Sequence, residues 1–131
     1  FHPVIASQPD GVTDGFYTFA QFDTPSKENC NEWVCNWIDK YEDIYGNSPN
    51  IGSAYGYMYA DITAKAIEIA GSDLNVDSFT SALESIDSYK MPFGESVLSW
   101  GPDKHLGSSD AYLFVVEDGR FVRADSMKYE Y

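Results

Sequence analysis

Residues 56–71 carry the most regular pattern of apolar positions in the chain, and this pattern predicts a helix. The apolar residues recur at spacings of three and four, as on one face of an α-helix: Tyr55, Met58, Tyr59, Ile62, Ala66 and Ile69. A second apolar row widens this face, so that the polar stripe is narrow and consists of Asp61, Lys65 and Glu68. We therefore expect other parts of the protein to cover this helix on most of its sides. Gly71 is placed for a left-handed C-cap.

A second helix is predicted before this one, over residues 27–45. Thr24 or Ser26 can cap its start, Pro25 suits a first helical turn, and Gly46 ends it. Its apolar residues share one face: Trp33, Val34, Trp37, Ile38, Tyr41, Ile44 and Tyr45.

A third helix is predicted after Gly71. Asn75 or Asp77 is placed to cap it. Its apolar row consists of Phe79, Leu83 and Ile86.

Short apolar segments bounded by turn residues predict five strands. They cover residues 3–6, 16–22, 96–100, 112–116 and 120–122. The last two form a hairpin around Asp118-Gly119, a pair that favours tight turns. Residues 88–94 are expected to be a loop. The fold class is therefore α/β, with the order β-β-α-α-α-β-β-β.

Charge and length limit the kinds of partner that this chain can have. It has 131 residues, enough for one domain with a modest core, and its net charge is -13 from 21 acids and 8 bases. Nucleic acid and anionic membrane surfaces are therefore not expected as partners, because both require clustered Lys and Arg. A solvated acidic surface is the expected meaning of this charge, with a cation site as the alternative. No apolar run is long enough for a membrane span, so membrane insertion is not expected.

The two cysteines, Cys30 and Cys35, both fall within the second predicted helix. A separation of five residues would place them about 140° apart around the helix axis. A disulfide between them would require the helix to start after Cys30. We therefore expect two free thiols, with Cys30 packed on the apolar face.

Residue types that support catalysis or metal binding do not occur at useful spacings. His2 and His105 are the two histidines, and neither has a nucleophile or carboxylate at a spacing that indicates a catalytic pair. Zinc, calcium and phosphate-loop patterns are absent from the sequence. We expect no enzyme activity and no cofactor.

Four motifs in order along the chain resemble one known family. They are the strand Gly15-Phe16-Tyr17-Thr18, the pattern Y-x-x-x-Y-G-x-x-P at residues 41–49, the Gly-Tyr pair at 56–57 leading into an apolar helix that ends in Ala70-Gly71, and the hairpin at 111–122. Together they resemble the late segments of type I periplasmic solute-binding proteins, the leucine/isoleucine/valine-type receptors of ABC importers. The resemblance covers residues 11–125.

The resemblance implies a fold of two α/β lobes, of which this chain is the C-terminal portion. Residues 1–18 would be second-lobe strands that lead into the hinge, 19–109 would be first-lobe helices and strand, and 110–131 would be the return crossing and the second-lobe hairpin. Because the family's fold needs more than about twice this length, the chain is expected to be the last third of a longer protein.

The start of the long helix is the first candidate for contact with a ligand. Unpaired amide groups at a helix N-terminus favour an anionic group such as a carboxylate, and Ser53, Tyr55 and Tyr57 add hydroxyls. The family often has a ligand-contacting aromatic at the position that is Gly52 here, so that this contact would come from Tyr55 or be absent. The alternative is that Ser53 caps the helix and that both tyrosines belong to the core.

The turn after the first predicted strand is the second candidate. Ser7, Gln8 and Asp10 follow the end of that strand, where ligands of open α/β sheets are found. The resemblance implies that Asp10 meets an amino group of the ligand. The alternative is that Asp10 only stabilises the turn before Gly11.

The resemblance implies a periplasmic or extracellular solute-binding component of an ABC importer. It would bind a small polar solute, such as an amino acid or an amide, between two lobes and deliver it to an ABC permease by hinge motion. Two alternatives remain: the ligand-binding domain of a sensor or receptor with the same fold, and a self-contained α/β interaction domain. The chain alone is expected to self-associate or to bind the missing N-terminal part.

Overall fold

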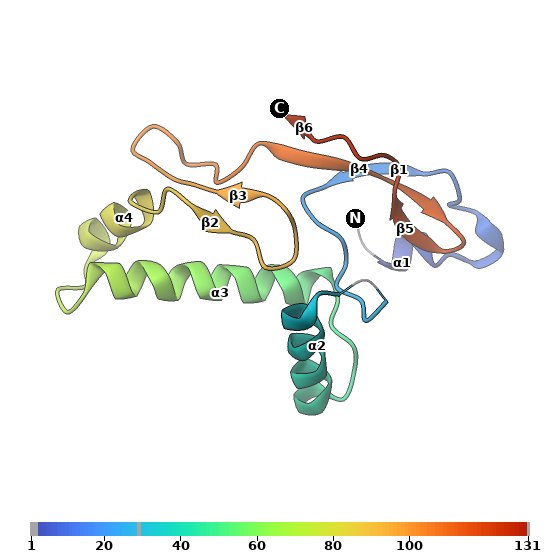
Figure 1. Ribbon diagram of the computed structural model, residues 1–131, viewed down its shortest axis with the longest axis horizontal. Helices are drawn as coiled ribbons and strands as arrows, with labels where there is room; N and C mark the ends of the chain where they lie inside the picture. The colour runs from blue at the N-terminus through green and yellow to red at the C-terminus, as the bar shows by residue number, and fades with distance from the viewer. Residues whose placement is uncertain (1–2, 29, 131) are drawn as a thin grey trace.

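The computed structural model describes residues 3–28 and 30–130, and it places a sheet beside a group of helices (Figure 1). The sheet lies at one end with α1, Pro3–Ala6, and the short 3-10 helix η1, Pro9–Gly11. The helices α3 and α4 lie toward the other end with a small two-stranded ribbon, and α2 lies below the start of α3; we call these elements the helical part. The chain leaves the sheet after β1 and returns to it at β4, so that two crossings join the parts.

The sheet is antiparallel and is built around β4, Asp110–Glu117. β1, Tyr17–Ala20, pairs with one side of β4 in the register Tyr17↔Val115. β5, Arg120–Arg123, pairs with the other side. β6, Tyr129–Glu130, also pairs with β4. The predicted hairpin of β4 and β5 is thus confirmed. The strand β6 was not predicted from the sequence.

The turn between β4 and β5 needs two residues with positive φ. Asp118 has φ 49 and Gly119 has φ 76, which is the pattern of the tight hairpin turn predicted for Asp-Gly. This turn fixes the position of Arg120, the first residue of β5.

The prediction of a strand over residues 3–6 is wrong, because these residues form the helical turn α1. Val4 and Ile5 suggested a strand through their β-branched side chains, but Pro3 suits the first turn of a helix. The Thr13 hydroxyl donates to the Ile5 carbonyl oxygen at 2.8 Å, which holds a helix-end carbonyl. The observed order of elements therefore begins with a helix and not with a strand. It also contains the strand β2, which the predicted order β-β-α-α-α-β-β-β does not include.

The helices α3, Ile51–Ala70, and α4, Val76–Glu84, confirm that both predicted helices exist, but α3 begins five residues before the predicted start at Gly56. Asn50 caps α3 and Asn75 caps α4, each in a reciprocal capping box with a serine three residues later. Gly71 follows α3 with φ 72 and ψ -152, a positive φ but outside the left-handed helical region. The helices α3 and α4 pack against each other (Figure 1).

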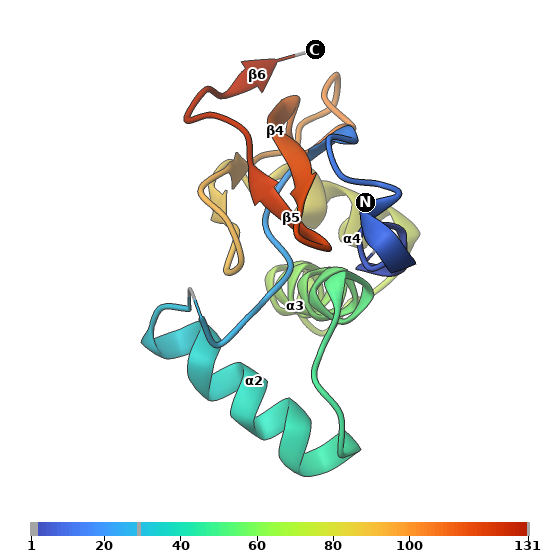
Figure 2. The same cartoon turned by 90° about the vertical axis from the view of Figure 1, so that its right-hand side faces the viewer.

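The helix α2, Glu32–Tyr45, starts five residues later than predicted. Asn31 caps it, with the Val34 amide donating to Asn31 Oδ1 at 2.9 Å, and Gly46 ends it in the left-handed region as predicted. Figure 2 shows α2 extending away from α3, which is seen nearly end-on. Thr24 and Ser26, the predicted caps, lie in irregular chain before the helix.

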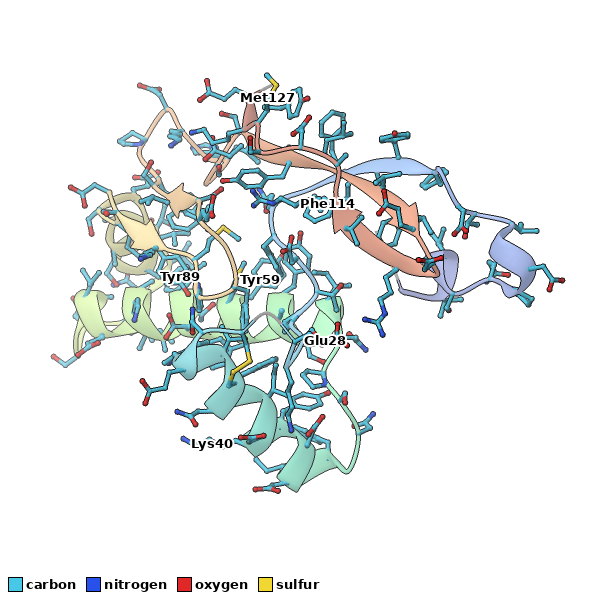
Figure 3. All side chains as sticks on the ribbon, turned by 45° about the vertical axis from the view of Figure 1, so that its right-hand side comes forward. Glu28, Lys40, Tyr59, Tyr89, Phe114 and Met127 are labelled. Carbon is cyan, nitrogen blue, oxygen red and sulfur yellow. A yellow bond between two sulfur atoms is a disulfide. The ribbon has the colours of Figure 1, made fainter. Side chains whose placement is uncertain are left out.

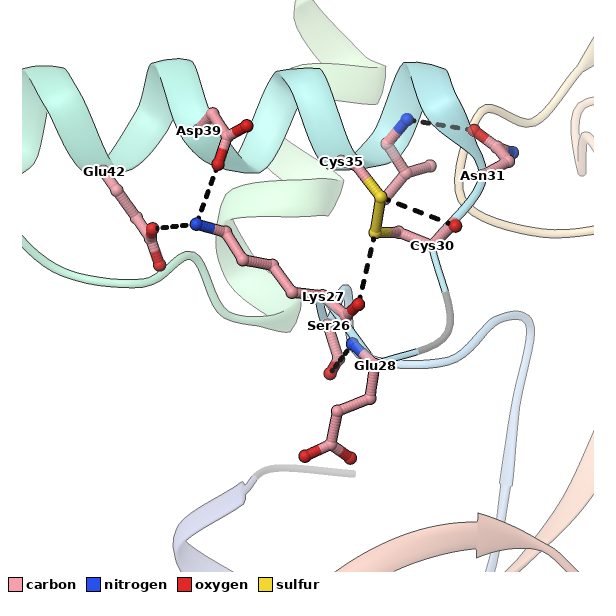
Figure 4. Close-up of a disulfide and its surroundings, with 9 residues drawn as sticks. Ser26, Lys27, Glu28, Cys30, Asn31, Cys35, Asp39 and Glu42 are labelled. Carbon is pink, nitrogen blue, oxygen red and sulfur yellow. Dashed lines mark hydrogen bonds and ion pairs between the residues drawn. A yellow bond between two sulfur atoms is a disulfide. The ribbon is translucent and has the colours of Figure 1, made fainter.

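Because α2 starts after Cys30, Cys30 and Cys35 form a disulfide, and the prediction of free thiols is wrong (Figure 4). Their Cα atoms are 5.3 Å apart, within the range that a disulfide spans. The prediction of free thiols failed because it placed both cysteines inside one helix. In a continuous helix, two residues five positions apart would hold their sulfur atoms on different faces.

The buried core of the helical part lies between α3, α2 and the ribbon of β2, Tyr89–Lys90, and β3, Val97–Leu98. β2 falls inside the predicted loop at 88–94 and pairs with β3. The core residues are Phe22, Val34, Ile38, Ile51, Ala54, Met58, Ile62, Ile86, Tyr89, Met91, Phe93 and Leu98.

The long helix α3 is covered on one side, not on most sides as its pattern led us to expect. Ile51, Ala54, Met58, Ile62 and Ala66 are buried, whereas Tyr59, Ile67 and Ile69 are exposed. None of the helices in the described residues combines the length and apolarity that crossing a membrane requires.

Candidate functional site

A cavity of about 890 Å³ lies where the helical part faces the β4–β5 hairpin. Its volume falls within the range of small-molecule sites. On one side it is lined by the chain that follows β1 and by the start of α2, and on the other by β5. The lining residues are Ala6, Phe22, Asp23, Thr24, Pro25, Ser26, Glu28, Cys30, Asn31, Val34, Pro92, Phe93, Gly94, Glu95, Gly119, Arg120, Phe121, Val122 and Arg123.

The floor of this cavity depends on a close approach at Gly94. A Cβ atom on Gly94 would lie 2.9 Å from the Cβ of Phe22, so a larger residue would push the two segments apart. Phe22 is fully buried and packs its ring 4.8 Å from Tyr55 and 6.1 Å from Phe93. The apolar floor is therefore continuous with the core under α3.

Charged groups of both signs meet at the wall formed by β5. The guanidinium of Arg123 stacks 3.7 Å from the ring centre of Tyr112, which fixes its plane. Arg123 Nε is 3.9 Å from Asp23 Oδ1, and Arg123 Nη1 is 3.9 Å from Glu95 Oε2. Both distances exceed hydrogen-bond range, so this cluster presents a cation and two carboxylates without direct hydrogen bonds among them.

The surroundings of Asp23 shift the pKa of its carboxyl group. Partial burial raises its pKa, the nearby Arg123 opposes that rise, and Glu95 adds to it.

A second ion pair crosses the edge of the cavity. Arg120 Nη1 donates to Glu28 Oε2 at 2.6 Å, although the two residues are 92 positions apart. Figure 3 shows Glu28 between α2 and the β4–β5 hairpin.

A smaller hollow of about 630 Å³ lies between α3, the segment that follows α4, and β2. Tyr89 donates its hydroxyl to Asp61 Oδ2 at 2.9 Å there, and Lys65 pairs with the same carboxylate at 3.4 Å. Asp61 and Lys65 both belong to the predicted polar stripe, and their spacing of four residues allows this pair. Trp33 and Tyr57 also line this hollow.

The predicted site residues at the start of α3 take part in packing and capping. Ser53 Oγ accepts from the Asn50 amide at 3.3 Å and donates to the Tyr41 hydroxyl at 3.0 Å. Tyr55 packs on Phe22 and is 5.9 Å from Tyr59. Gly52 is exposed in the first turn of α3.

Tyr57 points in another direction from Tyr55, as two residues of a helix separated by about 200° must. Its ring lies 5.5 Å from Trp33, 5.9 Å from Trp37 and 5.9 Å from Phe93. The structure therefore does not bring Tyr55 and Tyr57 to one surface: Tyr55 lies behind the floor of the 890 Å³ cavity, and Tyr57 lines the smaller hollow.

The second predicted group lies at the turn after α1. Ser7, Gln8 and Asp10 are exposed, and Gln8 Nε2 donates to the Val4 carbonyl oxygen at 2.5 Å. Asp10 has φ 61 and ψ 23, the left-handed conformation that Asp tolerates in turns. Among the described residues, Ala6 is the member of this stretch that lines the cavity.

The sequence did not single out Asp23, Glu95 and Arg123 as a charged group, because they lie in three separate segments. One signal was available: the chain has few basic residues, and its two arginines both stand in β5. The alternation of side chains along β5 could not show which carboxylates from other segments would face the two arginines.

The remaining candidate residues show no metal or catalytic grouping. His105 is exposed, and its Nε2 lies 3.1 Å from the Pro102 carbonyl oxygen. His2 lies outside the described residues. Within residues 3–28 and 30–130, no group of three or more His, Cys, Asp or Glu side chains is placed to hold a metal ion.

Comparison with protein families gives one match. The family model described as "Periplasmic binding protein" matches residues 2–120 of the chain. None of the curated proteins matches the sequence.

Comparison with solved structures gives the same fold at low sequence identity. A branched-chain amino acid ABC transporter protein from Thermus thermophilus with bound valine has a TM-score of 0.80 and 16% identity, over 100% of this chain and 37% of that one. A solute-binding protein from Rhodopseudomonas palustris in complex with 3,4-dihydroxybenzoic acid has a TM-score of 0.70 and 18% identity, over 98% and 34%. A leucine-binding protein from Thermotoga maritima has a TM-score of 0.70 and 17% identity, over 94% and 33%. The chain therefore spans about a third of the length of these proteins.

Proposed function

Because the chain belongs to the periplasmic binding protein family, we propose that it is the C-terminal portion of a solute-binding component of an ABC importer. This family consists of extracytoplasmic binding proteins and not of enzymes, in agreement with the expectation of no catalytic site. The Cys30–Cys35 disulfide supports a location outside the cytoplasm, since disulfides persist in oxidising compartments.

The observation that carries the proposal is the 890 Å³ cavity between the helical part and the β4–β5 hairpin. We assign residues 1–18 and 110–131 to the second lobe and residues 19–109 to the first, so that the cavity lies between segments of both lobes. A solute held there would join the lobes by contacting both at once.

The charges of the cavity favour a small polar solute that carries an amino group or both charges. Asp23 and Glu95 are suited to an ammonium or amide N–H, and the stacked guanidinium of Arg123 is suited to a carboxylate. Amino acids have both groups, as does the valine in the Thermus thermophilus structure. Ser7, Gln8, Asp10, Gly52, Ser53 and Tyr55 remain proposed as additional contacts in the full-length protein. Tyr57 lines the smaller hollow and remains proposed only as a contact for a solute bound there.

The test is a calorimetric titration of the full-length protein with amino acids, amides, urea and aromatic acids. We expect at least one amino acid or amide to bind, and we expect Asp23→Asn and Arg123→Gln each to weaken that binding by about 1–3 kcal/mol. Lys40→Gln, on the exposed side of α2, is the matched control and should leave the affinity unchanged (Figure 3). Failure of every solute to bind the folded full-length protein would contradict the proposal. A transmembrane helix in the full-length sequence would instead indicate the sensor alternative.

A further inference from the structure

The chain between β1 and α2 forms one wall of the cavity without belonging to a helix or strand. We refer to residues 22–28 as the arm. Five of its residues besides Phe22 line the cavity: Asp23, Thr24, Pro25, Ser26 and Glu28. A segment without its own secondary structure needs side-chain contacts to keep one position.

The arm is fixed to α2 at its end (Figure 4). Lys27 Nζ lies 2.7 Å from Asp39 Oδ1 and 2.6 Å from Glu42 Oε2, two carboxylates on one face of α2. The hydrogen bond to Asp39, and then that to Glu42, raises the pKa of the Lys27 amino group. Cys30 is bonded to Cys35 in the first turn of α2. The arm therefore reaches α2 through Lys27, and the chain just after the arm is tied to α2 by the disulfide at Cys30.

The next residue along the arm reaches in the opposite direction. Glu28 accepts from Arg120 Nη1 at 2.6 Å, and Arg120 belongs to β5 on the far wall of the cavity. Arg120 is itself placed by the tight turn at Asp118 and Gly119. Lys27 and Glu28 together thus connect α2 to β5 through the arm.

The stability of the Glu28–Arg120 ion pair depends on how firmly the backbone of the arm is fixed before the pair forms. Both partners of the Glu28–Arg120 pair are exposed, at 64% and 68%, and exposed ion pairs contribute little because holding two long side chains costs entropy. That cost falls when the backbone carrying one partner is already fixed. The disulfide closes a short loop, with a sequence separation of 5, so it stabilises the fold less than a disulfide that closes a long loop, and it restricts the chain directly after the arm.

We propose that the arm is a brace between the two walls of the cavity, and that the Cys30–Cys35 disulfide is what makes the Glu28–Arg120 bridge effective. Glu28 and Arg120 are positioning residues in this proposal, because they hold the walls and need not contact a solute. The inference goes beyond solute binding and does not depend on it.

The test measures opening of the arm by trypsin cleavage after Lys27 in the folded, solute-free, full-length protein. Cleavage of a folded segment reports the population of its open form. With the disulfide intact, we expect Arg120→Gln to speed cleavage after Lys27 by about fivefold, the effect of losing one ion pair. Arg120→Lys keeps the charge and should stay within about twofold of the parent protein. Cleavage after Lys65, inside α3, should be the same in all three and serves as the control for global unfolding.

The dependence on the disulfide is tested by repeating the comparison in the Cys30→Ser/Cys35→Ser background. This background should itself be cleaved faster after Lys27, and adding Arg120→Gln should then change the rate by less than about twofold. Equal effects of Arg120→Gln in both backgrounds would refute the role of the disulfide. No effect of Arg120→Gln in the oxidised protein, or equal effects of Gln and Lys, would refute the brace itself. If the serine background unfolds, seen as rapid cleavage after Lys65, the Gln–Lys comparison in the oxidised protein still decides whether the brace exists.

Discussion

Tyr89 is a buried residue whose ionisation is opposed by its surroundings. Burial raises the pKa of its phenol, and the hydrogen bond to Asp61 raises it further. Because the pKa is higher in the folded state, the folded protein holds this proton more tightly than the unfolded chain. The resulting stability is complete below the ordinary tyrosine pKa of about 10 and is lost as the pH rises from there toward the folded pKa.

Tyr89→Phe should therefore change both the stability and its dependence on pH. At pH 7 the loss of the hydrogen bond should lower the free energy of unfolding by about 1 kcal/mol. Above about pH 10 the variant should lose less stability than the parent, since it has no phenol to ionise at this site. Urea unfolding of the full-length protein at both pH values measures this. Tyr45→Phe, at an exposed tyrosine, is the control, and equal pH dependence of Tyr89→Phe and the parent would contradict the argument.

Tyr55 is a predicted contact residue whose ring packs on Phe22, a residue that lines the cavity. Tyr55→Ala in the full-length protein should weaken solute binding by about 1–2 kcal/mol, the usual effect of losing an aromatic contact. Lys65→Ala, at the smaller hollow, should not weaken it. Calorimetry gives both affinities, and equal losses for the two variants would show that Tyr55 acts through folding alone.

At the scale of elements, the N-terminus of α3 combines a cap with a proposed solute contact. Asn50 accepts from the Ser53 amide at 3.1 Å, and Ser53 Oγ accepts from the Asn50 amide. Asn50→Ala and Ser53→Ala should each lower the free energy of unfolding by about 1 kcal/mol. If Ser53 also contacts the solute, Ser53→Ala should weaken binding more than Asn50→Ala does. Chemical unfolding and calorimetry on the same two variants separate the roles, and equal affinities would leave Ser53 as a cap alone.

Elements whose cause is local were predictable from the sequence. The repeated apolar spacing of α3, the Asn75 cap of α4 and the Asp-Gly turn all depend on residues within a few positions of each other. The cap of α3 was not predicted correctly, because Ser53 was considered for this role and Asn50 fills it. The ribbon of β2 and β3 was only half predicted, because a two-residue strand is defined by its partner and not by its own pattern. β6 was missed for the same reason.

The start of α2 shows how a contact between distant residues can override a local signal. Thr24, Pro25 and Ser26 have the composition of a helix start, yet the chain there is irregular and is held by the Lys27 ion pairs and the disulfide. The later helix start and the Cys30–Cys35 disulfide therefore belong together, and Asp23 and Glu28 lie in the cavity wall as part of the same irregular chain. The charged group of Asp23, Glu95 and Arg123 could not be predicted from the sequence, because its three residues come from three segments that meet only in the folded protein.

At the scale of the whole molecule, the chain leaves large apolar side chains open to solvent. Phe16, Tyr17 and Phe19 on or beside β1 are 50%, 59% and 56% exposed, and Tyr59 on α3 is 63% exposed. Among the described strands, the sheet order is β1-β4-β5. The strands β1 and β5 are therefore the outer strands of this order, and each has one edge that no other strand in it covers. Contiguous apolar surface and open edges both favour association.

We therefore predict that the 131-residue chain alone is not a well-behaved monomer. It should self-associate, exchange elements with a second copy, or bind the N-terminal part of the full-length protein, because each outcome covers the surfaces of β1 and α3. Sedimentation at micromolar concentration should show species larger than 14.7 kDa. Tyr17→Glu, on the open face of β1, should weaken the association, whereas Val12→Glu, an equal change of charge at an exposed turn, should have a smaller effect. A sharp two-state unfolding transition of a monomer would contradict the prediction, since it would mean that these surfaces need no partner and that the chain completes its own core.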